Sequence, residues 1–146
     1  MEMGNTVITI QTTINVPVDI VWKLWSEPEH IVRWNAASDD WHTTKAENDL
    51  REGGKFSSRM EAKDGSMGFD FRGVYDRIVL HRHIDSTLGD NRKVKTTFSA
   101  IDNQTDIIES FEAEGTNPVD LQRNGWQAIL NNFKKYAEAY YPLPLV

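Results

Sequence analysis

The chain has no cysteine, no long apolar run and no cluster of basic residues. Without cysteine it can form no disulfide, thiol nucleophile or thiolate metal site. Its 16 Lys and Arg stand against 22 Asp and Glu, a net charge of −6, whereas sequence-independent nucleic-acid binding needs concentrated positive charge. No apolar run approaches the roughly 20 residues of a membrane-spanning helix, and residues 1–6 lack the pattern of a secretion signal. We therefore expect a soluble, cytoplasmic protein with no membrane span and no nucleic-acid partner.

Familiar catalytic and metal-binding motifs are also missing. The sequence has no nucleophile elbow, no phosphate-binding glycine loop and no zinc motif. His81 and His83 are two residues apart, and alternate residues of a strand point the same way. Their neighbours Ile78, Leu80 and Ile84 take the inward positions, so both histidines would face solvent without a third ligand. We expect no metal and no cofactor.

The C-terminal segment predicts one long amphipathic helix over residues 117–140. Asn117 is a suitable N-cap, and Pro118 suits the first helical position. Large apolar side chains then recur at steps of three and four residues, at Trp126, Ile129, Leu130, Phe133, Ala137 and Tyr140. A helix cannot bury so broad an apolar face by itself, so the rest of the chain has to cover it.

Most of the upstream sequence predicts short strands. Residues 6–16 alternate as a half-buried strand does, and Pro17 and Pro28 each begin a short helix, ending near residues 26 and 34. Further strands are expected at residues 41–48, 55–62, 69–75, 78–86, 92–100 and 105–113. Tight turns such as Asp64-Gly65 imply antiparallel pairing. The predicted fold is a single α+β domain over residues 1–146, in which a curved antiparallel sheet of about six or seven strands wraps around the long C-terminal helix.

Several short segments, in this order and spacing, carry a resemblance to a known family. They are Pro17 with Val21-Trp22 and Leu24-Trp25, residues 28–34, Asp49-Leu50-Arg51 with Gly53-Gly54-Lys55-Phe56, Gly73-Val74-Tyr75, and residues 124–136. The chain resembles the START-like (SRPBCC, helix-grip) superfamily and, more narrowly, the bacterial homologues of the activator of the heat-shock-protein-90 ATPase. This resemblance implies a hydrophobic cavity between the sheet and the long helix. The chaperone-binding domain of the eukaryotic activator is missing here.

The candidate ligand-binding residues are mostly large apolar side chains at inward positions. They are Trp25, Trp34, Phe56, Met60, Phe69, Phe71, Phe98, Glu109, Phe111, Trp126, Leu130 and Phe133. The same set would also fill an ordinary core, because inward aromatics are common in any packed domain. Gly73 and Gly125 both remove side-chain volume, and Gly125 costs about 1 kcal/mol of helix propensity relative to Ala. These glycines favour a cavity.

Glu109 is the one carboxylate in this set. A buried carboxylate has to be paired, protonated or in contact with a wet cavity. Its functional interpretation is a polar contact for a ligand, or a weak candidate for a catalytic acid or base. The alternative is an edge position, or an ion pair with a partner such as Arg123. Ser58 and Thr96 would add polar contacts on the same face.

Three functions remain open, and the first is our leading hypothesis. It is binding of a small hydrophobic or amphipathic molecule in a cavity between sheet and helix, in an unknown physiological role. The second is an enzyme of the cyclase or hydrolase kind that uses Glu109, or the pair Asp40 and His42, as acid–base residues. A polar loop followed by an edge strand explains Asp39, Asp40 and His42 more simply. The third is a chaperone-associated interaction module, for which the acidic outer faces give no signal.

Overall fold

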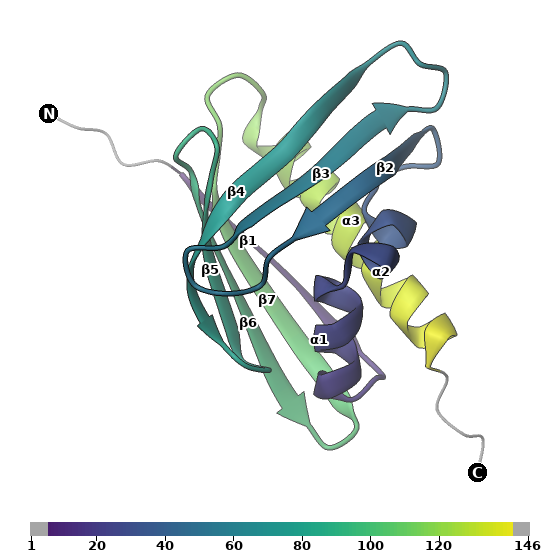
Figure 1. Ribbon diagram of the computed structural model, residues 1–146, viewed down its shortest axis with the longest axis vertical. Coiled ribbons are helices and arrows are strands. Elements are labelled where there is room, and N and C mark those ends of the chain that lie inside the picture. Colours follow the sequence, from purple (N-terminus) through teal and green to yellow (C-terminus); the bar gives the residue numbers. More distant parts are fainter. Residues whose placement is uncertain (1–5, 142–146) are drawn as a thin grey trace, which may run out of the picture.

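The protein is one curled sheet with helices on its inner face. A computed structural model describes residues 6–141 (Figure 1). Within this range the elements follow the order β1 (Val7–Ile14), α1 (Val18–Ser26), α2 (Pro28–Trp34), β2 (Trp41–Asn48), β3 (Lys55–Ala62), β4 (Gly68–Val79), β5 (His83–Leu88), β6 (Lys93–Ile101), β7 (Gln104–Glu112) and α3 (Val119–Tyr140). The predicted α+β fold, with two short helices after the first strand and a long helix at the end, is confirmed.

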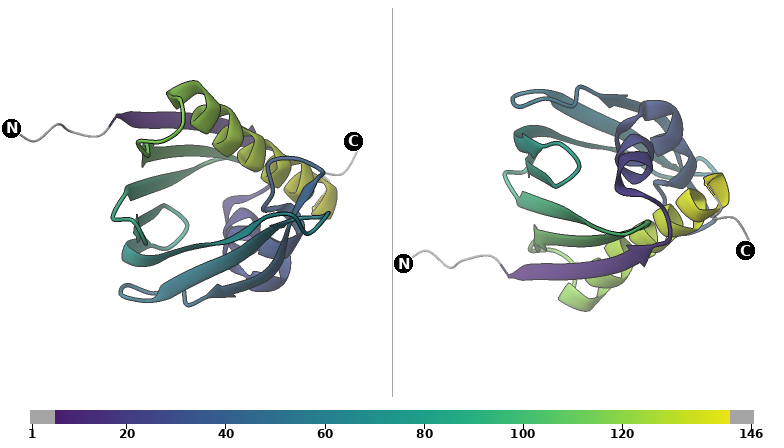
Figure 2. Two further views of the ribbon diagram at one scale, coloured as in Figure 1. Left: turned by 90° about the horizontal axis from the view of Figure 1, so that it is seen from above. Right: turned by 90° about the horizontal axis from the view of Figure 1, so that it is seen from below.

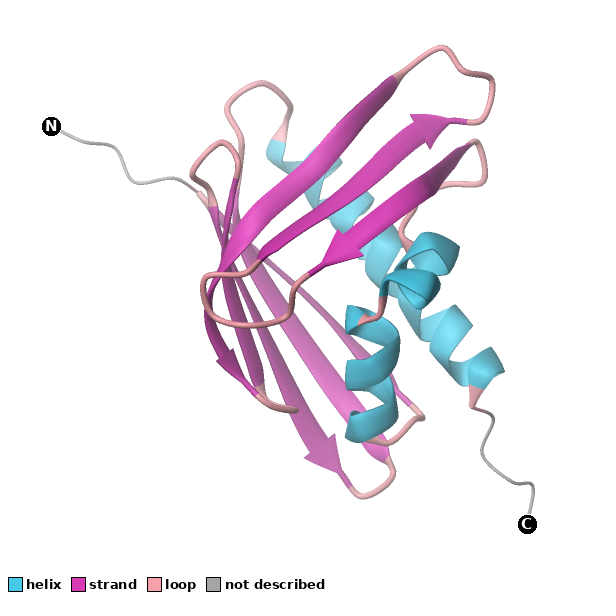
Figure 3. Cartoon of the chain, in the orientation of Figure 1, coloured by secondary structure: helices cyan, strands magenta, loops and turns pink. Residues whose placement is uncertain are grey.

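The sheet has the strand order β1-β7-β6-β5-β4-β3-β2, and all its neighbours are antiparallel. The helices lie together on one face of the sheet (Figure 3), and the sheet curls around them (Figure 2). β1 and β2 are the two edges. Because α3 packs on β1 and α2 packs on β2, the helices close the gap between these edges. Within residues 6–141, no helix is both long and apolar enough to cross a bilayer.

The prediction of one strand over residues 78–86 is wrong. β4 continues to Val79 past an irregularity between Tyr75 and Arg77, and the chain then turns at His81, where φ is +65°. The His81 ring contacts Trp22 edge-on, with centroids 5.8 Å apart. β5 begins only at His83, so the two histidines do not share the face of one strand.

A bulge decides which side chains of β2 point inward, a question that the sequence does not resolve. The pairing with β3 shifts register between Thr43 and Lys45. Thr43 is buried before the shift, and its hydroxyl donates to the Asn35 carbonyl at 2.6 Å. After the shift Ala46 packs against the core. One strand therefore changes parity midway, and simple alternation cannot describe it.

The long helix begins two residues later than predicted. α3 starts at Val119, and Pro118 occupies the N-cap position without a side-chain cap, so the assignment of this role to Asn117 is wrong. The side chain of Gln122 instead holds the segment that leads into α3. Its buried amide accepts a hydrogen bond from the Glu114 N–H at 2.9 Å and donates to the Asn117 carbonyl at 2.8 Å.

A hydrophobic core fills the space between α1, α3 and the strands β1, β6 and β7. Phe133 is completely buried, and its ring meets Trp25 and Trp34 edge-on, with centroid distances of 4.9 and 4.8 Å. Phe98 packs on Trp22 at 5.2 Å. The hydroxyl of fully buried Thr105 donates to the Val16 carbonyl at 2.7 Å. This hydrogen bond satisfies the one polar group of the Thr105 side chain, which is buried among apolar residues.

Gly73 does not open space in the sheet. A Cβ at this position would lie 2.6 Å from both Phe56 Cζ and the Thr87 carbonyl oxygen. Phe56 is the direct cross-strand neighbour of Gly73, and its ring covers the glycine. The missing side chain of Gly73 is therefore replaced by an aromatic ring from β3, and the expectation of free volume at this glycine is wrong.

Gly125→Ala should stabilise the protein. A Cβ at Gly125 would have no heavy atom within 4 Å, so the methyl group meets no obstacle. The substitution gains about 0.5–1 kcal/mol because Ala loses less conformational freedom in a helix than Gly. Urea denaturation measures the change. Gly73→Ala is the matched control and should destabilise, and a loss of stability in Gly125→Ala would show that this helical position has a packing constraint.

Candidate ligand-binding cavity

A cavity lies between the inner face of the sheet and the first half of α3. Its volume is about 330 Å³ and it is not fully enclosed. This lies at the lower end of the usual range for small-molecule pockets. Eight of the predicted residues line it: Trp25, Trp34, Phe56, Met60, Phe69, Phe71, Glu109 and Trp126. Phe69 is 47% exposed and Glu47 is also exposed, so the cavity lining reaches the protein surface at these two residues.

The other four predicted residues do not reach the cavity wall. Phe98, Phe111, Leu130 and Phe133 are at most 2% exposed and belong to the hydrophobic core. Phe111 lies directly behind the wall, because its ring stacks on Trp126 with centroids 3.8 Å apart and planes 11° apart. Trp126 also meets Phe71 edge-on at 5.8 Å. The half-buried Trp126 therefore separates the core from the cavity. Gly125 is not a lining residue, so its missing side chain does not form the cavity.

Four buried polar residues lie along the sheet face of the cavity. They are Ser58 on β3, Ser86 on β5, Thr96 on β6 and Glu109 on β7, each 3–9% exposed. Ser86 did not stand out in the sequence, although it has the inward parity of Ile84. Within residues 6–141, the hydroxyls of Ser58 and Ser86 make no hydrogen bond. Buried hydroxyls normally have hydrogen-bond partners. Because these two have none among the described residues, they are available to a ligand or to water.

Glu109 carries a carboxylate without a counter-ion. The Thr96 hydroxyl donates to its Oε2 at 3.2 Å, across directly paired positions of β6 and β7. Burial raises the pKa of Glu109 to about 7, and the hydrogen bond from Thr96 only partly opposes this. No cationic side chain of residues 6–141 forms an ion pair with Glu109. The carboxyl group is thus balanced between its neutral and charged forms near neutral pH.

Both simpler explanations for Glu109 are wrong. Its strand β7 lies between β1 and β6, so Glu109 is not at an edge of the sheet. Arg123 is exposed and pairs with Asp120, at 3.1 Å between Nη1 and Oδ1. A buried, uncompensated carboxylate is costly, and here it borders a cavity and has no cationic partner among residues 6–141.

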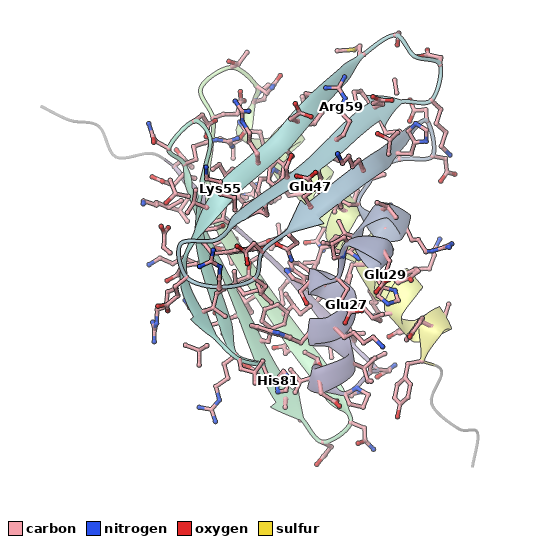
Figure 4. The ribbon with its side chains drawn as sticks, in the orientation of Figure 1. Glu27, Glu29, Glu47, Lys55, Arg59 and His81 are labelled. Carbon is pink, nitrogen blue, oxygen red and sulfur yellow. The ribbon has the colours of Figure 1, made fainter. Side chains whose placement is uncertain are left out.

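The polar groups nearer the opening are satisfied by protein contacts. The Tyr75 hydroxyl donates to Asn48 Oδ1, and burial raises the pKa of this tyrosine, which keeps it neutral. Glu47, on β2 (Figure 4), pairs with Lys45 at 3.0 Å. Arg92 Nε lies 2.7 Å from Asp90 Oδ2. In contrast to Glu109, the charged residues at the opening are therefore neutralised by surface neighbours.

The other candidate acid–base pair does not reach the cavity. Asp40 is exposed and accepts a hydrogen bond from Ser38 at 2.5 Å. His42 lies opposite Glu61 on the edge strand β2. Neither residue is part of the cavity wall. The predicted explanation by a polar loop and an edge strand agrees with this placement.

A small cluster with metal-ligand chemistry lies at the corner between α1 and α2. Glu27 and Glu29 (Figure 4) approach His30 there, with ligand atoms within 4.8 Å of one another. The cluster has contacts of its own. His30 Nδ1 lies 2.7 Å from the Tyr136 hydroxyl, and Nε2 lies 3.8 Å from Glu27 Oε1. The contact with Tyr136 joins α2 to α3, and the contact with Glu27 lies within the corner, so we assign no ligand to this cluster.

Comparison with known proteins identifies the family. The sequence pattern described as "Activator of Hsp90 ATPase homolog 1-like protein" matches residues 15–138. The chain belongs to this family. The predicted resemblance to START-like bacterial homologues of the Hsp90 ATPase activator is therefore confirmed. Among curated proteins, none matches the chain.

Solved structures resemble the chain, two of them in both sequence and fold. An AHSA1-like protein from Aeromonas hydrophila is 42% identical, with a TM-score of 0.87, over 92% of this chain and 94% of that one. A protein from Cytophaga hutchinsonii is 48% identical, with a TM-score of 0.80, over 95% and 96%. A Nitrosomonas europaea protein has a TM-score of 0.78 over 94% and 97%. At 16% identity, this last likeness concerns the fold alone.

Proposed function

We propose that the protein binds a small hydrophobic or amphipathic molecule in the cavity between the sheet and α3. The observation that carries this proposal is the combination of aromatic walls with buried polar groups that the protein leaves unpaired. Trp126, Phe71 and Phe56 provide apolar surface, while Ser58 and Ser86 offer free hydroxyls. Ligand pockets typically combine a mostly apolar lining with a few such polar groups.

The size of the cavity limits the kind of ligand. About 330 Å³ suits a compact molecule, such as a fused ring system or a short chain. The two acyl chains of a phospholipid together are too large for it. The opening beside Phe69 and Glu47 would leave one end of a longer molecule in contact with solvent.

An enzyme is the second candidate, and one observation favours it. The pKa of Glu109 near 7 suits a general acid or base at neutral pH. It ranks second because Glu47 and Arg92, the charged residues elsewhere on the described wall, are engaged by surface neighbours. A chaperone-associated role has no comparable observation in its favour.

Binding can be tested by NMR with isotope-labelled protein. A mixed library of single-chain lipids, flavonoids, sterols and other apolar metabolites should cause saturable shifts at the Trp126 indole N–H and at the amides of Phe71 and Ser86. These groups lie on the cavity wall. Shifts confined to the outer face of the sheet would contradict the proposal, as would no shift with any compound.

A matched pair of variants localises the binding. Ser86→Met places extra volume inside the cavity and should abolish the shifts. Ser99→Met adds the same side chain at an exposed position of β6 and should preserve them. Equal binding by both variants would place the ligand elsewhere on the protein.

A further inference from the structure

The charge around the cavity is unbalanced at one point. Glu109 is 9% exposed, and among residues 6–141 its polar contact is the neutral hydroxyl of Thr96, at 3.2 Å. The other carboxylate of the wall, Glu47, has Lys45 at 3.0 Å. Glu109, inside the cavity, thus lacks a cationic partner, whereas Glu47, at the surface, has one.

The one cationic side chain on the described wall already donates to two protein acceptors. Arg92 directs Nε to Asp90 at 2.7 Å and Nη1 to the Glu112 carbonyl at 3.3 Å. Glu109 in its ionised form would repel an anionic ligand in the cavity. A cationic ligand would remove the cost of the buried carboxylate.

Aromatic rings beside Glu109 favour the same kind of ligand. Phe111 follows Glu109 by two residues, so both side chains lie on the same face of β7. Trp126 stacks on Phe111 and forms the neighbouring part of the cavity wall. The indole face attracts cations, most strongly where water is excluded. Carboxylate and ring together provide a site for positive charge, with apolar walls beyond it.

We propose that the ligand is an amphipathic amine, a compact apolar body with one basic nitrogen that forms an ion pair with Glu109. This inference rests on the proposed function and specifies its ligand class. The ammonium group donates to Glu109, while the apolar body lies against Phe71 and Trp126.

Three probes with the same naphthalene ring test the inference. Isothermal titration calorimetry at pH 8 compares naphthylethylamine, naphthylethanol and naphthylacetate, which differ in the charge of the polar end. Glu109, with its pKa near 7, is ionised at this pH. We expect the amine to bind at least about tenfold more tightly than the alcohol, and the acetate most weakly, because one compensated buried charge is worth about tenfold or more.

Glu109→Gln then tests the residue itself. The amide keeps the shape of the side chain but removes the charge, so the amine should lose about tenfold in affinity while the alcohol changes little. The control is Glu61→Gln. Glu61 points away from the cavity on β3 and pairs with Arg59, so this variant should retain the preference for the amine.

The outcomes separate this inference from the proposed function. Equal binding of amine and alcohol to the native protein would overturn the amine class and leave the proposed function standing. A preference for the amine that survives in Glu109→Gln would also overturn it. Absence of binding by all three probes at millimolar concentration would contradict the cavity as a ligand site, and with it both proposals.

Discussion

Phe133→Ala should lower the free energy of unfolding by about 3–5 kcal/mol. The ring is completely buried and lies against Trp25 and Trp34, at centroid distances of 4.9 and 4.8 Å. Removing it leaves a void that surrounding helices α1, α2 and α3 cannot collapse to fill, because each is already packed on the sheet or on another helix. Urea denaturation followed by far-UV circular dichroism gives the change.

Trp126→Ala is the matched comparison and should cost appreciably less, about 2 kcal/mol. One face of Trp126 packs on Phe111, but the residue is only half-buried and already borders a cavity. Truncation there creates less new void. Equal losses in both variants would mean that Trp126 is packed on all sides, and its place in a ligand-binding wall would then be untenable.

Glu109→Gln should stabilise the protein at pH 8, by up to about 3 kcal/mol. Burial raises the pKa of Glu109 from 4.5 for the free side chain to about 7 in the folded protein. Between pH 4.5 and 7 the folded state binds more protons than the unfolded state, so stability falls as pH rises through this window. Above pH 7 both states are ionised and the full cost of the buried charge is present. Gln carries no charge and avoids that cost.

The difference between variant and native protein should therefore depend on pH. Urea denaturation at pH 8 should show the full gain, and at pH 4.5 or below the gain should be nearly absent. Uncharged Ile10, Thr96 and Trp126 face Glu109 or its cavity from β1, β6 and α3. Glu29→Gln, which removes an exposed charge, is the comparison variant. A gain that is the same at both pH values would mean that Glu109 is solvated or paired in solution.

The two Glu109→Gln experiments constrain each other. A residue kept for binding a cation is expected to reduce the stability of the empty protein, because its charge is compensated only when the ligand is present. If the variant gains stability and loses preference for the amine, both follow from the same uncompensated carboxylate.

Local patterns in the sequence were sufficient for most of the secondary structure. The alternation in residues 55–62 gives β3 with the observed bounds, and the spacing of apolar residues gives α3 to within two residues of its start. These features repeat over short distances, so no knowledge of contacts is needed to recognise them. The turn at His81 and the bulge after Thr43 were not predictable in this way, since each depends on the pairing of neighbouring strands.

Sequence patterns were enough to predict a sheet wrapped around a C-terminal helix and one inward-facing carboxylate, Glu109. Which inward side chains form the core and which border the cavity depends on tertiary contacts. Parity cannot separate Phe111 from Phe71, because both point to the same side of the sheet. Phe111 is covered by the stacked ring of Trp126, whereas Phe71 meets only its edge and remains on the cavity wall. That distinction depends on which residues distant in sequence come into contact. The same holds for Glu109, which meets Thr96 and no cationic side chain among the described residues.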